Sequence, residues 1–263
     1  YALCRLGVCA KPVLRVGGDY ESNGFKKFLQ EGSVPLDGIT ELPEEATSVC
    51  YLIQDKNNDH ITIFYPGAMD GKYARPLADE LFADVKLGVI TVASRQDNEE
   101  FFAKCRKHKV PVVFGMKDDF NAFPEAFLKQ LLQGSKIIFT NEVERKMIED
   151  MYGLKDITEI FEIGEVEIIV NTLGREGSVC YIREGEKVRK EKIGICKVER
   201  VVDATGSGDA YMAGFIYGYL HGCQPAECCK LGGRLSSFIL QAEGCCTNVP
   251  TERQLLEKVK VFE

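Results

Sequence analysis

The spacing of apolar residues predicts alternating strands and helices over most of the chain. Near-continuous apolar runs at 87–92, 110–114, 137–140 and 168–172 predict strands buried on both faces, as in a parallel sheet. Between them, the pattern at 96–107, 124–132 and 142–152 is typical of helices. This order predicts an α/β fold with a mostly parallel central sheet flanked by helices.

Further elements are expected before and after this core. Residues 1–7 have the pattern of a helix that ends at a glycine, which favours further residues before Tyr1. The remaining expected strands are at 12–16, 178–182 and 188–202, and the remaining expected helices are at 22–30, 209–221, 225–241 and 251–260.

The β-rich stretches 47–54 and 60–65 are separated by the polar cluster 55–59 and predict a hairpin. Apolar residues occupy both alternations of its first strand, with Val49, Tyr51 and Ile53 on one and Cys50 and Leu52 on the other. An apolar hairpin of this kind needs cover on both faces. We therefore expect a lid that closes over substrate on one side and pairs with a second subunit on the other, in a homodimer.

This interpretation divides the chain into two parts. Residues 36–67 form the β-rich lid, and residues 1–35 together with 68–263 form the α/β core. No internal repeat interrupts either part.

Composition narrows the classes of function. The chain is 45% hydrophobic and 28% charged, as is typical of a soluble globular protein. A net charge of −7 offers no basic surface for nucleic acid or an anionic membrane, and no apolar run is long enough for a membrane span. The eleven cysteines lack the paired spacing of a zinc site, so we expect most of them to be small buried hydrophobes in a reducing compartment. We expect a cytoplasmic enzyme or binding protein.

The segment 201–209, Val-Val-Asp-Ala-Thr-Gly-Ser-Gly-Asp, is the most informative for chemistry. It predicts a strand, a glycine-rich turn and then an apolar, buried helix. Gly206 and Gly208 let backbone N–H groups approach an anion, and the N-terminus of a helix attracts phosphate. Asp209 at this point can accept a proton from an attacking hydroxyl. The alternative is that Asp209 only caps the helix and the glycines only form a turn.

The full pattern Asp203-x-x-Gly-x-Gly-Asp209 resembles the C-terminal signature of the ribokinase-like family, also called the phosphofructokinase B-type carbohydrate kinases. That family includes ribokinase, fructokinases and adenosine kinase. The resemblance implies that Gly206, Ser207 and Gly208 form an anion hole and that Asp209 is the general base. It also places Asp203 and Thr205 beside the nucleotide.

A second match, Thr140-Asn141-Glu142-Val143-Glu144, follows a strand and opens a helix. It resembles the family's Asn-x-x-Glu motif, which implies that Asn141 and Glu144 organise Mg²⁺ and phosphate, largely through water. Mg²⁺ suits this role because it keeps several waters and takes few carboxylates. The alternative is a capping box, with Asn141 as N-cap and Glu144 three residues later.

Two weaker matches extend the nucleotide site. Thr172, Gly174 and Gly177 stand where a strand–turn–strand of the family borders ATP, although a plain hairpin turn has the same pattern. Small residues around Gly232 lie where the family places adenine, and a buried helix explains them equally well. Gly244 lies in the loop where the family binds a monovalent cation such as K⁺.

The chain departs from the family pattern in three places. Cys245 follows Gly244 where alanine is usual, and Gly115-Met116 stands where adenosine-kinase-like members often have Asp-Pro. The family's first strand, with a substrate-binding aspartate and a Gly-Gly-x-x-x-Asn motif, would lie before Tyr1.

The resemblance spans nearly the whole chain. It implies a kinase that uses ATP and Mg²⁺ to phosphorylate a hydroxyl of a small sugar or nucleoside. The segment 64–69 favours an adenosine-kinase-like or uncharacterised member, while ribose and fructose stay open as acceptors. The alternative from another class is a non-catalytic ligand-binding protein on the same fold. The joint presence of Asp209, Asn141 and Glu144 favours the enzyme. No P-loop motif is present.

Overall fold

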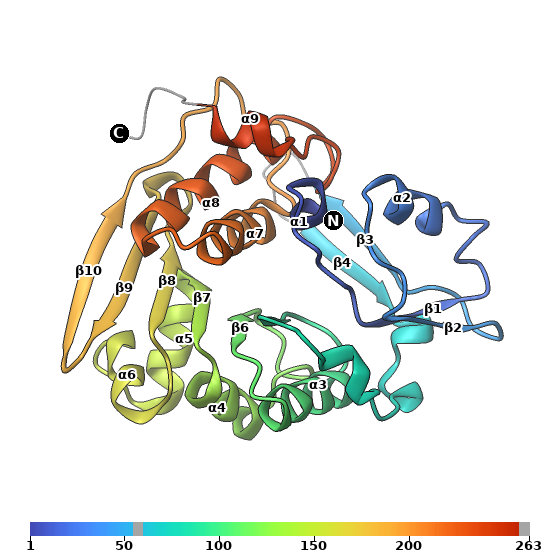
Figure 1. Cartoon of the computed structure of the whole chain (residues 1–263), viewed down its shortest axis with the longest axis horizontal. Coiled ribbons are helices and arrows are strands. Elements are labelled where there is room, and N and C mark those ends of the chain that lie inside the picture. The colour runs from blue at the N-terminus through green and yellow to red at the C-terminus, as the bar shows by residue number, and fades with distance from the viewer. Residues whose placement is uncertain (55–59, 258–263) are drawn as a thin grey trace.

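The computed structural model describes residues 1–54 and 60–257. Within these residues, a six-stranded sheet has the order β10-β9-β8-β7-β6-β5 (Figure 1). Strands β5 to β8 pair in parallel, and β8–β9 and β9–β10 pair antiparallel. The strands are β5 (Gly88–Ile90), β6 (Val112–Gly115), β7 (Ile137–Asn141), β8 (Ile168–Thr172), β9 (Ser178–Glu184) and β10 (Lys187–Ile193). The predicted α/β fold with a mostly parallel sheet is confirmed.

Helices cover both faces of this sheet (Figure 1). One layer holds α3 (Arg95–Lys107), α4 (Glu125–Gly134), α5 (Glu142–Tyr152) and α6 (Ile160–Ile163), and the other holds α7 (Ser207–Leu220) and α8 (Pro225–Ile239). Strand β7 serves both layers because successive side chains alternate across a strand. Ile138 packs in the core with α3, α4 and α5, whereas Ile137 and Phe139 pack against α7 and α8.

The N-terminal part adds α1 (Ala2–Arg5), β1 (Leu14–Gly17), α2 (Phe25–Glu31) and β2 (Ile39–Leu42). Strands β1 and β2 form a separate parallel pair, and β2 was not predicted from the sequence. The hairpin strands are confirmed as β3 (Val49–Gln54) and β4 (His60–Tyr65), while the expected turn at 55–59 lies outside the described residues. The division into core and lid at residue 36 stays a prediction.

Two side chains fix the base of the hairpin. Asp19 Oδ1 accepts hydrogen bonds from the backbone N–H and the hydroxyl of Thr47, both at 2.7 Å. These bonds hold the pKa of Asp19 below its usual value. Buried Arg15 donates from Nε to the Ala68 carbonyl at 2.8 Å and forms a two-pronged ion pair with Asp97 of α3. The hairpin is thereby anchored to the core.

The strand predicted at 188–202 is too long. Strand β10 ends at Ile193, which pairs with Ser178, the first residue of β9, so the pairing with β9 ends there. Val201 and Val202 are 49% and 43% exposed in a loop. The glycine-rich turn therefore follows a loop instead of the predicted strand.

The remaining helices are short. The last described helix is α9 (Glu252–Leu256), and the predicted helix beyond residue 257 lies outside the described residues. Short 3₁₀ helices lie at Gly67–Met69, Gly71–Tyr73, Asp79–Phe82, Ile157–Glu159 and Gly174–Glu176. In the described part of the chain, no helix is both long and apolar enough to cross a membrane.

The cysteines are less buried than expected. All eleven are free thiols, and five of them are buried. The prediction that most are buried is wrong because several lie in loops and in the exposed hairpin, including Cys9, Cys50 and Cys245.

Candidate active site

The carboxyl ends of β6, β7 and β8 meet at one edge of the sheet because these strands are parallel. Asn141 and Thr172, the last residues of β7 and β8, are paired directly across the two strands. Met116, just after β6, donates its N–H to the Phe139 carbonyl at 3.0 Å and extends the same edge. The sheet therefore brings segments that are distant in sequence to one place.

Asn141 and Glu144 form a capping box at the start of α5. The Asn141 N–H donates to Glu144 Oε2 and the Glu144 N–H donates to Asn141 Oδ1, each at 2.8 Å. Glu144 is only 7% exposed, and burial raises the pKa of its carboxyl while the Asn141 N–H opposes that rise. The capping alternative is thus present in the structure, and a role for these residues in binding Mg²⁺ stays a prediction.

The glycine-rich turn gives α7 an open N-terminus. Gly206 is the N-cap, in the left-handed conformation with φ of 76°, and it has no side chain to cap the turn. A Cβ at Gly206 would lie 2.4 Å from Cys245 Cβ, so the Gly244–Cys245 loop packs directly on the turn. A Cβ at Gly208 would meet no atom within 4 Å. The first turn of α7 therefore borders open space.

Asp209 is the third residue of α7, so the alternative that it caps this helix is wrong. Its side chain is 59% exposed. Its Oδ1 lies 3.5 Å from Lys117 Nζ, two residues beyond β6. Asp209 and Lys117 also act electrostatically on Glu144, which places the starts of α5 and α7 and the end of β6 around one site.

Asp203 connects the two loops beside α7. Its Oδ1 accepts from the Thr205 N–H and its Oδ2 from the Gly244 N–H, both at 2.9 Å. These two bonds hold the pKa of Asp203 below its usual value. Asp203 thereby positions the glycine-rich turn and the Gly244–Cys245 loop against each other.

Three other predicted residues have clear structural roles. Gly177 has φ of 87° and lies against the Ile193 carbonyl, while Gly174 has φ of 55° in an open turn. Both allow the tight turn between β8 and β9. Gly232 lies where α8 crosses α7, since a Cβ there would be 2.6 Å from the Tyr211 carbonyl oxygen. Their contact with a nucleotide stays a prediction.

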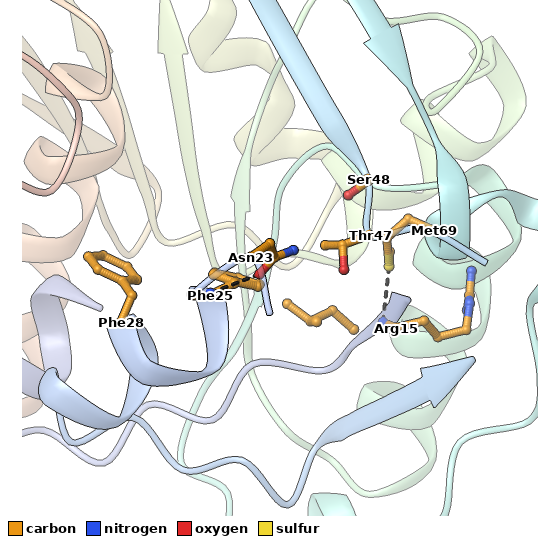
Figure 2. Close-up of a pocket in the computed structure, with 9 residues that line it drawn as sticks. Arg15, Asn23, Phe25, Phe28, Thr47, Ser48 and Met69 are labelled. Carbon is orange, nitrogen blue, oxygen red and sulfur yellow. Dashed lines mark hydrogen bonds between the residues drawn. The ribbon is translucent and has the colours of Figure 1, made fainter. Parts of the chain in front are cut away.

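A cavity of about 530 Å³ lies between β1, the start of α2 and the base of the hairpin. Figure 2 shows this cavity, whose lining residues are Leu14, Arg15, Asn23, Gly24, Phe25, Phe28, Thr47, Ser48 and Met69. Its walls combine aromatic rings with an amide and hydroxyls, as small-molecule sites do. This cavity was not predicted from the sequence because its residues are far apart in the chain.

Lys117 was not predicted as a site residue from the sequence either. A signal was available, since Lys117 follows a predicted parallel strand by a few residues and such positions lie at the ligand-binding edge. Among the described residues, no three or more His, Cys, Asp or Glu side chains are grouped as they would be to hold a metal ion. Any divalent cation here would take further ligands from phosphate and water.

Comparisons with known proteins agree with this geometry. The family model described as pfkB family carbohydrate kinase matches residues 1–252. A nucleoside kinase of Methanocaldococcus jannaschii is 27% identical over 97% of this chain and 81% of its own length. An uncharacterised sugar kinase of Archaeoglobus fulgidus is 32% identical over 94% of this chain and 98% of its own length.

Solved structures show the same likeness. The crystal structure of the M. jannaschii nucleoside kinase, described as an archaeal member of the ribokinase family, has a TM-score of 0.87 and 26% identity, over 97% of this chain and 82% of that one. A Burkholderia thailandensis nucleoside kinase in complex with ADP-inosine has a TM-score of 0.82 and 25% identity, over 97% and 77%. The chain therefore belongs to the pfkB family of carbohydrate kinases, and its reaction is the ATP-dependent phosphorylation of a sugar or nucleoside.

Proposed function

We propose that the chain is a nucleoside kinase in which Asp209 is the general base. The observation that carries this proposal is the exposed Asp209 carboxylate in the first turn of α7, beside the open space at Gly208. A carboxylate next to an anion-binding helix N-terminus can deprotonate a hydroxyl where phosphate is held. Two relatives that cover most of this chain are named nucleoside kinases, which favours a nucleoside over a free sugar.

The residues divide the work of phosphoryl transfer. Asp209 accepts the proton of the acceptor hydroxyl as its oxygen attacks the γ-phosphorus, and ADP leaves with the bridging oxygen. The N–H groups of Gly206 and Gly208 would face the charge on the transferred group, whereas the Ser207 N–H donates to the Ala204 carbonyl at 3.2 Å. Asp203 keeps this turn in place through Thr205 and Gly244.

Asn141 and Glu144 fit a water-mediated Mg²⁺ site, because one carboxylate beside an amide oxygen suits an ion that keeps most of its waters. Bound there, Mg²⁺ would neutralise charge on the phosphates. A monovalent cation near Gly244 and a cytoplasmic location also stay predictions.

The acceptor is tested by incubating the protein with ATP, Mg²⁺ and one acceptor at a time: adenosine, inosine, cytidine, ribose or fructose. We expect release of ADP with a nucleoside and none above background with the sugars. Release with ribose alone would contradict the nucleoside assignment and leave the kinase intact.

The base is tested with Asp209→Asn, which should reduce kcat by ~10²–10⁴ while ATP binding measured by calorimetry stays within about threefold of wild type. Asp150→Asn is a matched control, because Asp150 lies on the surface of α5 and its carboxylate pairs with Lys146 at 3.1 Å. Retention of wild-type kcat by Asp209→Asn would refute the assignment.

The hairpin also supports the predicted homodimer. The strand register places six apolar side chains on one face, namely Val49, Tyr51, Ile53, Ile61, Ile63 and Tyr65. All six are at least 37% exposed. An isolated two-stranded hairpin is marginal in water, so covering this face with the same face of a second subunit would stabilise it.

Light scattering after size-exclusion chromatography tests the dimer. We expect wild type to elute as a dimer and Ile63→Lys as a monomer. The control is Thr62→Lys, which alters the opposite face of β4. A monomeric wild type at high protein concentration would refute the proposal.

A further inference from the structure

Lys117 is held at the site by its backbone, and its ammonium reaches Asp209 through a long ion pair. The Met116 N–H bonds to the Phe139 carbonyl of β7 on one side, and the Asp119 N–H bonds to the Lys117 carbonyl at 2.8 Å on the other. The side chain is 42% exposed, and its ammonium contacts Asp209 at 3.5 Å, longer than a charge-assisted hydrogen bond. This combination suits a side chain that moves to a ligand.

Close packing explains why Lys117 reaches Asp209. A Cβ at Gly115 would lie 3.2 Å from Met212 Sδ, so the end of β6 closely contacts α7. Met212 is three residues after Asp209, about one helical turn, and Lys117 is two residues after Gly115. The Gly115-Met116 departure from the family pattern thus lies at the contact that brings the lysine to the base.

The charges around Lys117 indicate the kind of ligand that its ammonium could bind. The negative charges of Asp118 and Asp209 both act to raise the pKa of Glu144, and the positive charge of Lys117 opposes them. The γ-phosphate of ATP must approach these carboxylates to be transferred. Without a cation, that approach would be opposed by like charge.

We propose that Lys117 is a catalytic residue whose ammonium leaves Asp209 and contacts a non-bridging oxygen of the γ-phosphoryl group when ATP binds. This inference rests on the proposed function of Asp209. In the step, the bond from the acceptor oxygen to phosphorus forms and the bond from phosphorus to the β–γ bridging oxygen breaks. The hydroxyl proton goes to Asp209, and Lys117 stays protonated throughout. Its departure also frees Asp209 to accept that proton.

The test uses Lys117→Met, which keeps the length of the side chain and removes its charge. We expect kcat to fall ~10²–10³-fold with saturating ATP and nucleoside. The affinity for ATP should fall about tenfold while the affinity for ADP stays within about twofold, because ADP lacks the γ-phosphate. Lys117→Arg, which keeps the charge, should recover part of kcat.

The control is Lys146→Met on α5, whose ammonium pairs with Asp150 at 3.1 Å and whose side chain is 69% exposed. It should behave as wild type. Unchanged ADP binding reports that Lys117→Met is folded, and Lys117→Gln replaces it if that variant does not fold. Equal losses of ATP and ADP affinity, or a kcat within threefold of wild type, would overturn the proposal.

The two proposals fail differently. An inactive wild type, or an Asp209→Asn variant with full activity, would count against the proposed function. An active wild type that depends on Asp209 and is indifferent to the charge at position 117 would refute the role of Lys117 alone.

Discussion

The glycine-rich turn needs a residue without a Cβ at Gly206 for stability and at Gly208 for phosphate binding, and single substitutions can separate these two requirements. Gly206→Ala tests the requirement for stability. Gly206 has φ of 76°, a conformation that costs an alanine roughly 1–2 kcal/mol. The new Cβ would also lie 2.4 Å from Cys245 Cβ, and relief of such overpacking typically costs about 1–3 kcal/mol. We therefore expect the free energy of unfolding of Gly206→Ala to be about 2–5 kcal/mol lower than that of wild type.

Two other glycines serve as controls for this magnitude. Gly153 ends α5 with φ of 64° and has no atom within 4 Å of an added Cβ, so Gly153→Ala should cost only the conformational ~1–2 kcal/mol. Gly208 lies inside α7 with open space around it, so Gly208→Ala should leave stability unchanged or raise it by about 0.5–1 kcal/mol. Its methyl group would enter the proposed phosphate site and reduce kcat/KM for ATP at least tenfold, since small displacements of reacting groups are costly.

Thermal unfolding, monitored by circular dichroism, measures the loss of stability in Gly206→Ala. At about 2–4 °C per kcal/mol for a protein of this size, Gly206→Ala should melt at least roughly 4 °C below wild type and below Gly153→Ala. ADP release with a nucleoside measures the fall in kcat/KM for ATP in Gly208→Ala. The reasoning is refuted if Gly206→Ala melts with or above Gly153→Ala, or if Gly208→Ala keeps wild-type kcat/KM for ATP.

Three further predictions concern residues around the same turn. The neighbouring Cys246 lowers the pKa of Cys245 to about 6, so alkylation of Cys245 by iodoacetamide, followed by mass spectrometry, should reach its full rate near pH 7 and should abolish activity. Buried Cys105, with its pKa raised to about 12, should stay unmodified. An alkylation rate of Cys245 that rises only above pH 8 would contradict the prediction for Cys245. Because folding lowers the pKa of Asp203, the Asp203 carboxylate should stabilise the protein at pH 7 and lose this effect as the pH falls below about 4. The difference in melting temperature between wild type and Asp203→Asn should therefore disappear on acidification. Asn141→Ala removes a helix cap and should lower the free energy of unfolding in urea by ~1 kcal/mol, whereas Asn141→Ser should restore it. If Asn141→Ser restored activity as well, that would argue against a role for the amide in binding Mg²⁺.

Several features of this protein were determined by the sequence alone. The apolar runs that became β6, β7 and β8 were predicted because a strand buried on both faces needs apolar residues on both alternations. The Asn141–Glu144 motif and the turn at Gly206 were predicted because each is encoded within a few consecutive residues. Local patterns of this kind do not depend on the rest of the chain.

Tertiary structure decided the features that join distant segments. Strand β2 is short and has a mixed pattern, so only its pairing with β1 identifies it. Val201 and Val202 have the composition of a strand and lie in a loop because β9 has no further residues to pair with them. The packing of Cys245 on Gly206, the bond from Asp203 to Gly244 and the contact of Lys117 with Asp209 each require two segments to meet. Such contacts depend on strand order and helix packing, which no short stretch of sequence encodes.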